Sequence, residues 1–162
     1  MCITDSAGTE QAIAELSADG GDVAAEAIMT TDSVSKTAVV SRDGWTIGGM
    51  AKGAGMLAPG LATMLVVITT DAVLEPLEAD AALRFATGTT FDRLDSDGCM
   101  STNDQVTLLA NGASGVTPDL KHFSAALAEL CLELAVKLQS DAEGASHDIT
   151  IEVRHAASEG EA

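Results

Sequence analysis

A threonine that follows a glycine-rich stretch is the residue of this sequence best suited to chemistry. The stretch covers residues 48–65 and reads GGMAKGAGMLAPGLATML, with Thr63 just before a strand-like apolar run. A threonine hydroxyl is a weak nucleophile until a base lies beside it, and a chain cut immediately before the threonine supplies its new α-amino group as that base. Such an amine titrates near pH ~8, so it can take a proton at neutral pH. Thr63 is therefore a candidate nucleophile.

The residues around Thr63 also favour self-cleavage of the chain between Ala62 and Thr63. Three glycines from Gly53 to Gly60 permit backbone angles that other residues avoid, and Pro59 fixes one more angle. The Ala62 carbonyl can then be held where the Thr63 hydroxyl attacks it. This attack gives an ester that water opens, which leaves Thr63 with a free amine. The alternative is an ordinary β-branched residue entering a strand, which is how an isolated Ala-Thr pair would be interpreted.

Three separated segments give the sequence a family resemblance. They are MAKGAGMLAPGLATML at 50–65, TFDRLDSDGCMSTND at 90–104 and SDAEGAS at 140–146. In this order they resemble the ornithine acetyltransferase / glutamate N-acetyltransferase family of arginine biosynthesis, whose precursor cuts itself before such a threonine. The resemblance covers nearly the whole chain, although residues 1–20 carry no motif. Family members are considerably longer, so residues 1–162 are expected to be the central part of a self-processing acetyltransferase.

The resemblance also implies two substrate-binding residues besides Thr63. The family lysine at the position of Lys52 contacts substrate, and its cation can hold the α-carboxylate that ornithine and glutamate derivatives share. The family glutamate in the D-A-E-G setting of Glu143 binds substrate too, and its carboxylate can pair with the amine of ornithine. The alternatives are a surface lysine on a flexible loop and a solvated charge near a helix C-terminus, where the helix dipole disfavours an acid.

The reaction implied by the resemblance is a two-step acetyl exchange. Thr63 Oγ attacks the acetyl carbonyl of N-acetylornithine, forms an acetyl-threonine ester, releases ornithine and passes the acetyl group to glutamate. No organic cofactor or metal is required, and acetyl-CoA is a possible donor substrate. The family also implies a fold of layered sheets and helices like that of N-terminal nucleophile hydrolases, an oligomer, and two cleaved pieces that partner each other.

Two other functions stay open at this point. The first is a related self-cleaving aminopeptidase or amidohydrolase, which releases its acyl group to water. The second is an inactive fragment that associates with other segments, because the Thr-Gly pair that stabilises the oxyanion in the family lies upstream of the matched region. One oxyanion donor contributes ~3–4 kcal/mol. The chain alone is therefore expected to be weak or inactive as an enzyme.

Composition and charge exclude several classes of protein. The 162 residues fit one domain, and 46% apolar residues are enough for a core. A formal net charge of −17 argues against nucleic acid or an anionic membrane as a partner and favours a solvated acidic surface. The apolar run at 56–68 is interrupted by Pro59 and Gly60 and is too short for a membrane span, and residues 1–8 lack the pattern of a signal peptide. A cytoplasmic protein is the default expectation.

Metal sites and disulfides are not expected from the sequence. The three cysteines, Cys2, Cys99 and Cys131, share no CxxC spacing and read as reduced thiols, and the three histidines are scattered. The DSDG run at 95–98 is similar to a calcium loop, but its register puts Arg93 at the first ligand position, so calcium is discarded. The resemblance implies a structural, site-shaping loop there instead.

Hydrophobic periodicity and capping signals predict a mixed α/β or α+β class. Strands are predicted at 36–41, 64–70, 105–110 and 148–154, and short helices at 9–16, 22–29 and 78–86. The clearest helix is predicted to begin at Pro118, capped by Thr117, and to end near Gly144, because leucines and Phe123 recur at spacings of three and four. The glycine-rich stretch between the first two strands is predicted to be a loop.

Overall fold

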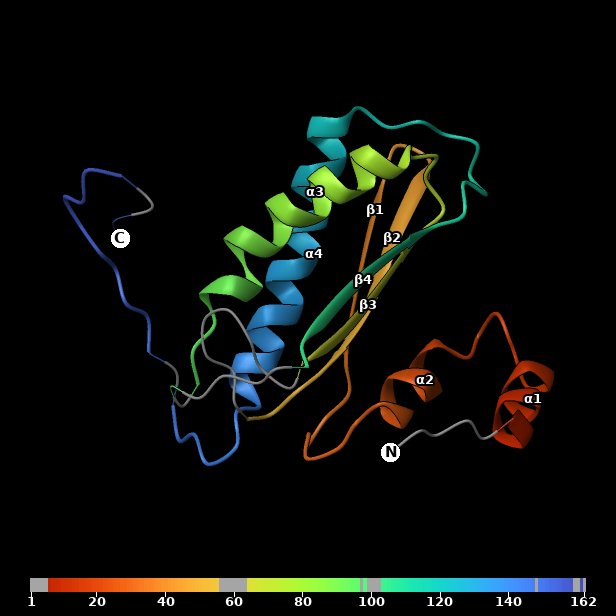
Figure 1. Cartoon of the computed structure of the whole chain (residues 1–162), viewed down its shortest axis with the longest axis horizontal. Coiled ribbons are helices and arrows are strands. Elements are labelled where there is room, and N and C mark those ends of the chain that lie inside the picture. The colour runs from red at the N-terminus through yellow and green to blue at the C-terminus, as the bar shows by residue number, and fades with distance from the viewer. Residues whose placement is uncertain are drawn as a thin grey trace.

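The computed structural model describes residues 6–55, 64–96, 98, 103–147, 149–158 and 161. Within them the chain forms four strands, four α-helices and a short 3-10 helix, which confirms the mixed α/β class (Figure 1). In chain order these are α1 (Ser6–Ala14), α2 (Gly21–Ala27), β1 (Lys36–Arg42), β2 (Trp45–Lys52), β3 (Leu65–Thr70), α3 (Pro76–Thr89), η1 (Phe91–Arg93), β4 (Gln105–Ala110) and α4 (Leu120–Ser140).

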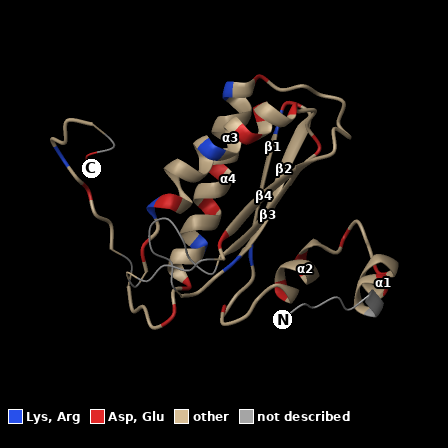
Figure 2. Ribbon diagram, in the orientation of Figure 1, with Lys and Arg blue, Asp and Glu red and all other residues tan. Residues whose placement is uncertain are grey.

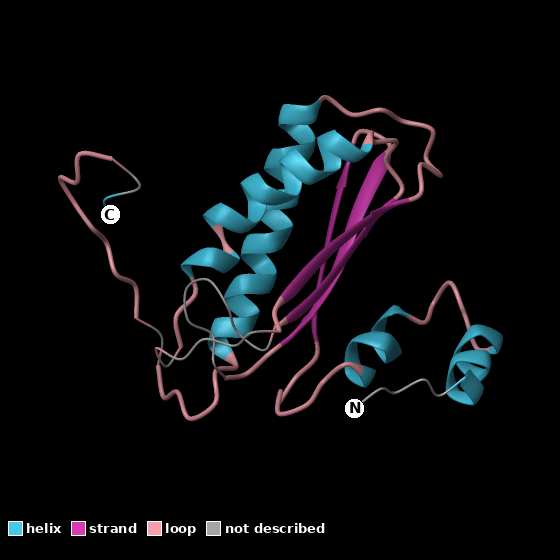
Figure 3. Cartoon of the chain, in the orientation of Figure 1, coloured by secondary structure: helices cyan, strands magenta, loops and turns pink. Residues whose placement is uncertain are grey.

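The four strands, magenta in Figure 3, form one mixed sheet. Their order is β1-β2-β3-β4. The pairs β1–β2 and β2–β3 are antiparallel, while β4 runs parallel to β3. Asp43 and Gly44 join β1 to β2 with φ angles of 40° and 88°. Two consecutive positive angles are those of a two-residue type I′ turn, whose twist matches that of the strands it connects. The sequence therefore builds a tight hairpin in which β2 returns along β1.

Helices α3 and α4 cover one face of the sheet, with α4 packed directly on β1 and β2 and α3 packed on α4 (Figure 1). The apolar face of α4 is fully buried, and the ring of Phe123 lies 5.4 Å from that of Trp45, centroid to centroid. Burial of such side chains contributes roughly 1.5–3 kcal/mol each, so this helix is the main support of the sheet. The buried residues of α4 are Phe123, Ala126, Leu127, Leu130, Cys131, Leu134, Ala135 and Leu138.

The close approach of α4 explains a glycine inside β2. A Cβ added to Gly49 would lie 3.0 Å from Leu130 Cδ2 and 3.1 Å from Leu134 Cδ1. Its neighbour Gly48 points to the other face of the sheet, where the nearest atom to an added Cβ is Thr69 Oγ1 at 3.9 Å. The close approach of α4 to the strand therefore requires glycine at position 49. It does not require glycine at position 48, which faces away from the helix.

This difference predicts that alanine substitutions at the two adjacent glycines change the free energy of unfolding differently. Gly49→Ala is expected to lower the free energy of unfolding by ~1–3 kcal/mol, because Leu130 and Leu134 must leave their packed positions. Gly48→Ala is the matched control and is expected to leave stability unchanged or to raise it by up to ~1 kcal/mol, because alanine lowers the entropy of the unfolded chain. Urea unfolding of both variants measures this, and equal losses would contradict the packing described for α4.

The opposite face of the sheet is less covered. Helix α2 contacts β1 and β2 there (Figure 1). Val39 and Leu109 belong to one cross-strand row of this face and are 68% and 55% exposed. The sheet therefore has one buried face under α4 and one face that is largely open in the described part of the chain.

Two predictions about strands are wrong. Residues 48–52, the first part of the predicted glycine-rich loop, belong to β2, because glycine in a strand is favoured where another backbone or helix approaches closely. The strand predicted at 148–154 is absent from the described residues 149–154. Ile149, Ile151 and Val153 alternate as a strand would, but they are 74%, 86% and 53% exposed and pair with no described strand.

The long helix and two shorter helices begin at other residues than predicted. Helix α4 begins at Leu120, because the Asp119 carboxylate accepts the His122 amide at 3.1 Å and so caps the first turn. Helix α3 begins at Pro76, where the Glu75 amide donates to Glu78 Oε2 at 3.1 Å. Helix α2 starts at Gly21, one residue before the start predicted at residue 22.

Candidate functional site

The structure places Lys52 and Glu143 at the same end of the sheet. Lys52 is the last residue of β2, and Glu143 follows the C-terminus of α4. The two segments meet where the Glu143 amide donates to the Ala54 carbonyl at 2.5 Å. A Cβ added to Gly55 would lie 3.6 Å from Glu143 Oε2, so the carboxylate lies beside the glycine-rich stretch. The two segments that carry the residues predicted for substrate thus meet at this end of the sheet.

Ala62 and Thr63 lie outside the described residues, so the predicted cleavage point stays a prediction. The described residues that flank this part of the sequence are Gly55 and Met64. The Met64 amide donates to Asp104 Oδ1 at 2.8 Å, and the Gln105 amide donates to the Met64 carbonyl at 3.0 Å. Asp104 belongs to the DSDGCMSTND motif and so anchors the residue that directly follows Thr63 in the sequence.

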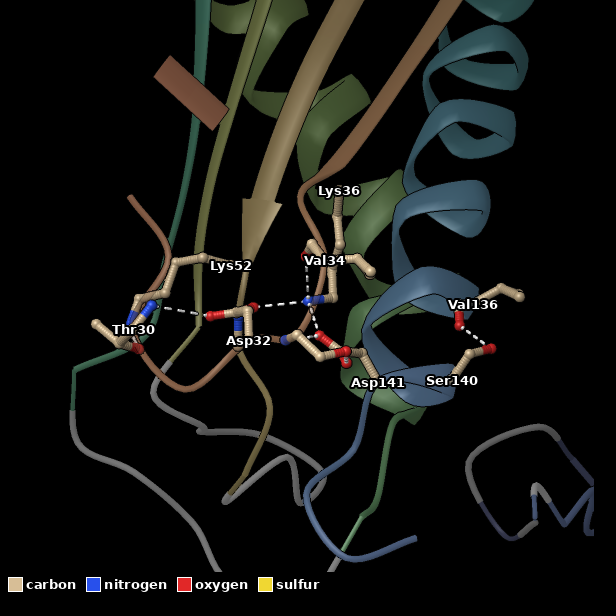
Figure 4. A network of polar contacts seen from close by, with 10 residues as sticks. Thr30, Asp32, Val34, Lys36, Lys52, Val136, Ser140 and Asp141 are labelled. Carbon is tan, nitrogen blue, oxygen red and sulfur yellow. Dashed lines mark hydrogen bonds and ion pairs between the residues drawn. The ribbon is translucent and has the colours of Figure 1, made fainter. Parts of the chain in front are cut away.

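Lys52 is buried at the end of β2, whereas the sequence predicted that it lies in a glycine-rich loop. Lys52 as a whole residue is 6% exposed, and its backbone pairs with Leu65 across β2 and β3. Lys52 Nζ donates to Thr30 Oγ1 at 3.4 Å, and no described residue supplies it with a carboxylate (Figure 4). An ammonium group has three donors and is costly to bury without an anionic partner. The group is therefore suited to hold the carboxylate of a ligand. Thr30, which the sequence did not single out, is its one partner in the described chain.

Glu143 is exposed, and the residue lies in a turn beyond the end of the helix. Helix α4 ends at Ser140, and Gly144 follows in the left-handed conformation with φ of 76°, which favours glycine. The D-A-E-G pattern therefore encodes the turn that carries Glu143 back to Ala54.

A buried ion-pair network lies between the segment that contains Lys52 and the segment that contains Glu143 (Figure 4). Lys36 Nζ is 2.6 Å from Asp32 Oδ1 and 2.6 Å from Asp141 Oδ2, and the side chain of Lys36 is completely buried. Asp32 Oδ1 also accepts the Gly53 amide at 2.6 Å, and Asp141 accepts the amide and the hydroxyl of Ser33. We term Asp32, Lys36 and Asp141 the clamp. One signal for the clamp is visible in the sequence, because Lys36 has the same strand parity as the inward residues Ala38 and Val40 of β1.

Hydrogen bonding keeps both clamp carboxylates ionised. Burial would raise the pKa of Asp32, but the Gly53 amide, Lys36 and the Thr30 amide together lower it below its ordinary value. Burial acts in the same direction on Asp141, and Lys36 and Ser33 lower its pKa. Because both values are lowered in the folded chain, the clamp stabilises the fold above the ordinary carboxyl pKa of ~3.9, and this stability is lost as the pH falls through the lowered values.

Comparison with known proteins identifies the family. A model of the ArgJ family matches residues 4–162. The chain belongs to the ArgJ family. The resemblance carried by the three sequence segments is thereby confirmed, since the match covers nearly all of the chain.

Three relatives carry the same protein name and are longer than this chain. The arginine biosynthesis bifunctional protein ArgJ of Streptomyces coelicolor is 64% identical over 155 residues, which are 96% of this chain and 40% of the relative. The protein of the same name from Thermobifida fusca is 61% identical over 156 residues, 96% of this chain and 41% of the relative. The protein of the same name from Mycobacterium leprae is 60% identical over 144 residues, which are 88% of this chain and 35% of the relative. The chain thus spans about two fifths of the length of these relatives.

Other site types find no support in the described residues. No group of three or more His, Cys, Asp or Glu side chains is arranged to hold a metal ion in the part of the chain that the structure describes. Cys131, the described cysteine, is a free thiol in the core, and burial raises its pKa to about 12. No described helix combines the length and the apolar character that crossing a membrane demands. Acidic residues are spread over the helices and loops (Figure 2), as expected for a solvated acidic surface.

Proposed function

We propose that this chain carries the nucleophile and two substrate-binding residues of an acetyltransferase that moves an acetyl group from N-acetylornithine to glutamate. Membership of the ArgJ family supports the reaction class, because the relatives are named bifunctional proteins of arginine biosynthesis. The observation that carries the proposal is that Glu143 meets Ala54 and Gly55, which follow Lys52 and lead into the Thr63 segment.

The proposed reaction begins with cleavage of the chain between Ala62 and Thr63. Thr63 Oγ then attacks the acetyl carbon of N-acetylornithine, and its proton passes to the α-amine of Thr63. The bond from the acetyl carbon to the ornithine nitrogen breaks, and that nitrogen takes up the proton as ornithine leaves. Glutamate attacks the acetyl-threonine ester through its amine, the ester bond breaks, and Oγ regains a proton. The acetyl group itself is the electrophile, so acetyl-CoA is a possible alternative donor.

Lys52 and Glu143 orient the substrate in this proposal. The buried Lys52 ammonium, which has no described carboxylate partner, binds the α-carboxylate that both acetylornithine and glutamate carry. The exposed Glu143 carboxylate binds the side-chain amine of ornithine. Lys52 is the last residue of β2 and Glu143 Oε2 lies beside Gly55, so a substrate held by both residues is presented to the segment that contains Thr63.

The two pieces produced by cleavage are proposed to stay together. The cleavage point lies between β2 and β3 in the sequence, and these strands pair along residues 47–52 and 65–70 in the middle of the sheet. Helix α4, from the second piece, packs on β1 and β2, from the first. Separation would expose this core, including Ile47, Ile68 and Leu130.

The test uses a chimera in which this chain replaces the matching part of the Streptomyces coelicolor relative, with which it is 64% identical. We expect the chimera to form acetylglutamate from acetylornithine and glutamate. We also expect two pieces that elute together under native conditions and separate in denaturant. Release of free acetate without acetylglutamate would favour the amidohydrolase alternative, and an uncut, inactive chimera would favour the inactive fragment.

A further inference from the structure

The clamp connects the two segments that carry the proposed substrate residues. Asp32 accepts the amide of Gly53, the residue directly after Lys52, at 2.6 Å. Asp141 lies two residues before Glu143 in the sequence. Lys36 Nζ joins the two carboxylates, each at 2.6 Å, and completes its three donors with the Val34 carbonyl at 3.3 Å. Figure 4 shows this chain of contacts running from the Lys52 side of the sheet to the end of α4.

Every polar group of the clamp is used within the protein. Lys36 has its three donors satisfied, whereas Lys52, on the neighbouring strand, has Thr30 Oγ1 as its one described partner. Asp32 accepts from Lys36, from the Gly53 amide and from the Thr30 amide. The clamp therefore binds no ligand itself. It also ties Thr30, the neighbour of the Lys52 ammonium, to the same carboxylate that holds Gly53.

Stability alone does not account for the clamp. The side chains of Asp32 and Lys36 are completely buried, and that of Asp141 is 10% exposed. Buried ion pairs gain little net stability, because the attraction between the charges is offset by the loss of hydration. The clamp moreover places two carboxylates against one ammonium. Where such groups are kept, fixing one geometry among alternatives is an attested role.

We propose that Asp32, Lys36 and Asp141 are positioning residues that fix Lys52 relative to Glu143 for substrate binding. The inference rests on the proposed acetyltransferase function, since it assigns substrate to Lys52 and Glu143. Loss of either carboxylate detaches one of the two segments from Lys36 while the other stays attached, and the hydrogen bond from Glu143 to Ala54 is then the direct link between the segments. The substrate carboxylate and amine then no longer meet both partners in one arrangement, so binding of acetylornithine weakens while Thr63 chemistry is retained.

The test compares three Asp→Asn variants of the chimera. Asp32→Asn and Asp141→Asn change the clamp. Asp71→Asn is the matched control, because Asp71 Oδ1 accepts the Thr46 amide at 2.7 Å at the opposite end of β2, just as Asp32 accepts the Gly53 amide. Each variant is assayed at a temperature where unfolding experiments show it to be folded. Acetylornithine is varied at fixed glutamate, and hydrolysis of p-nitrophenyl acetate is measured separately.

We expect both clamp variants to raise the KM for acetylornithine about tenfold or more with kcat changed less than about threefold, a pattern that marks lost binding. Hydrolysis of p-nitrophenyl acetate, which has neither the carboxylate nor the amine, should stay within about twofold of the parent chimera. Asp71→Asn should match the parent on both substrates. If Asp32→Asn does not fold, the partly exposed Asp141→Asn decides the test.

Three results would overturn the inference. Unchanged KM values in both clamp variants would show that the clamp does not position Lys52 and Glu143. Equal losses on both substrates, or equal losses in Asp71→Asn, would indicate a general effect on the fold, as would failure of both clamp variants to fold. An unmodified chimera that transfers no acetyl group would reject the proposed function itself, and the positioning role with it.

Discussion

Thr63→Ala is expected to abolish both chain cleavage and acetyl transfer in the chimera. The variant lacks the hydroxyl that attacks the Ala62 carbonyl, and without cleavage it also lacks the free α-amine that serves as base. No other residue of the GGMAKGAGMLAPGLATML stretch has a side chain that can carry the acetyl group in this mechanism. Denaturing gel electrophoresis and acetylglutamate formation measure the two losses.

Thr63→Ser is the control for this variant. Serine keeps the hydroxyl, so we expect slow cleavage and partial acetyl transfer. Thermal unfolding of both variants shows whether the fold is retained. Substantial acetylglutamate formation by Thr63→Ala would remove Thr63 from the mechanism.

Lys52→Met and Glu143→Gln are each expected to lower kcat/KM for acetylornithine roughly ten- to hundredfold. Each variant loses charge-assisted hydrogen bonds to substrate, which contribute ~1.5–3 kcal/mol. Because Lys52 is buried without a described carboxylate partner, methionine should leave the melting temperature unchanged or raise it. Glu143 is exposed, so Gln should change stability by ~0.5 kcal/mol or less. Parallel steady-state kinetics and thermal unfolding measure both effects.

Two charge-removing variants elsewhere serve as controls. Lys137→Met removes an ammonium that binds Glu133 and the Thr37 carbonyl, and Glu129→Gln removes the exposed partner of Arg42. Both should keep kcat/KM within about twofold of the parent, since neither residue is proposed to touch substrate. Cleavage should also survive in Glu143→Gln, because no free substrate takes part in it. Unchanged kinetics in Lys52→Met and Glu143→Gln, or a loss of stability that explains their kinetic defect, would reject the substrate-binding roles.

Local patterns in the sequence predicted much of the fold. The apolar spacing that includes Phe123, Leu127 and Leu134 produced α4, and β-branched runs produced β3 and β4 within a residue of their observed bounds. Strand β2 was missed because its glycines have no side-chain pattern, and the close approach of α4 that requires Gly49 is a tertiary contact. The strand predicted at 148–154 failed for the opposite reason, since alternation at Ile149 and Ile151 does not supply a neighbouring strand.

The candidate site was predictable only where a motif carried it. Lys52 and Glu143 lie in segments that resemble the family, so the sequence could name them. The contact between the two segments at Ala54 depends on the hairpin and on the length of α4. The burial of Lys52 could not be read from a glycine-rich stretch that resembled a loop. The clamp joins Asp32 and Asp141 through Lys36, and no local pattern relates residues so far apart in the chain.

The measurement that tests the central claim most directly is the mass of the piece that begins at Thr63. The chimera is incubated with N-acetylornithine in the absence of glutamate, quenched in acid and analysed by intact-mass and peptide mass spectrometry. The proposed mechanism predicts a piece with Thr63 at its N-terminus that is heavier by one acetyl group on the threonine, and loss of that group when glutamate is added before quenching. Formation of acetylglutamate by a chimera that stays uncut, or whose Thr63 is never acetylated, would contradict it.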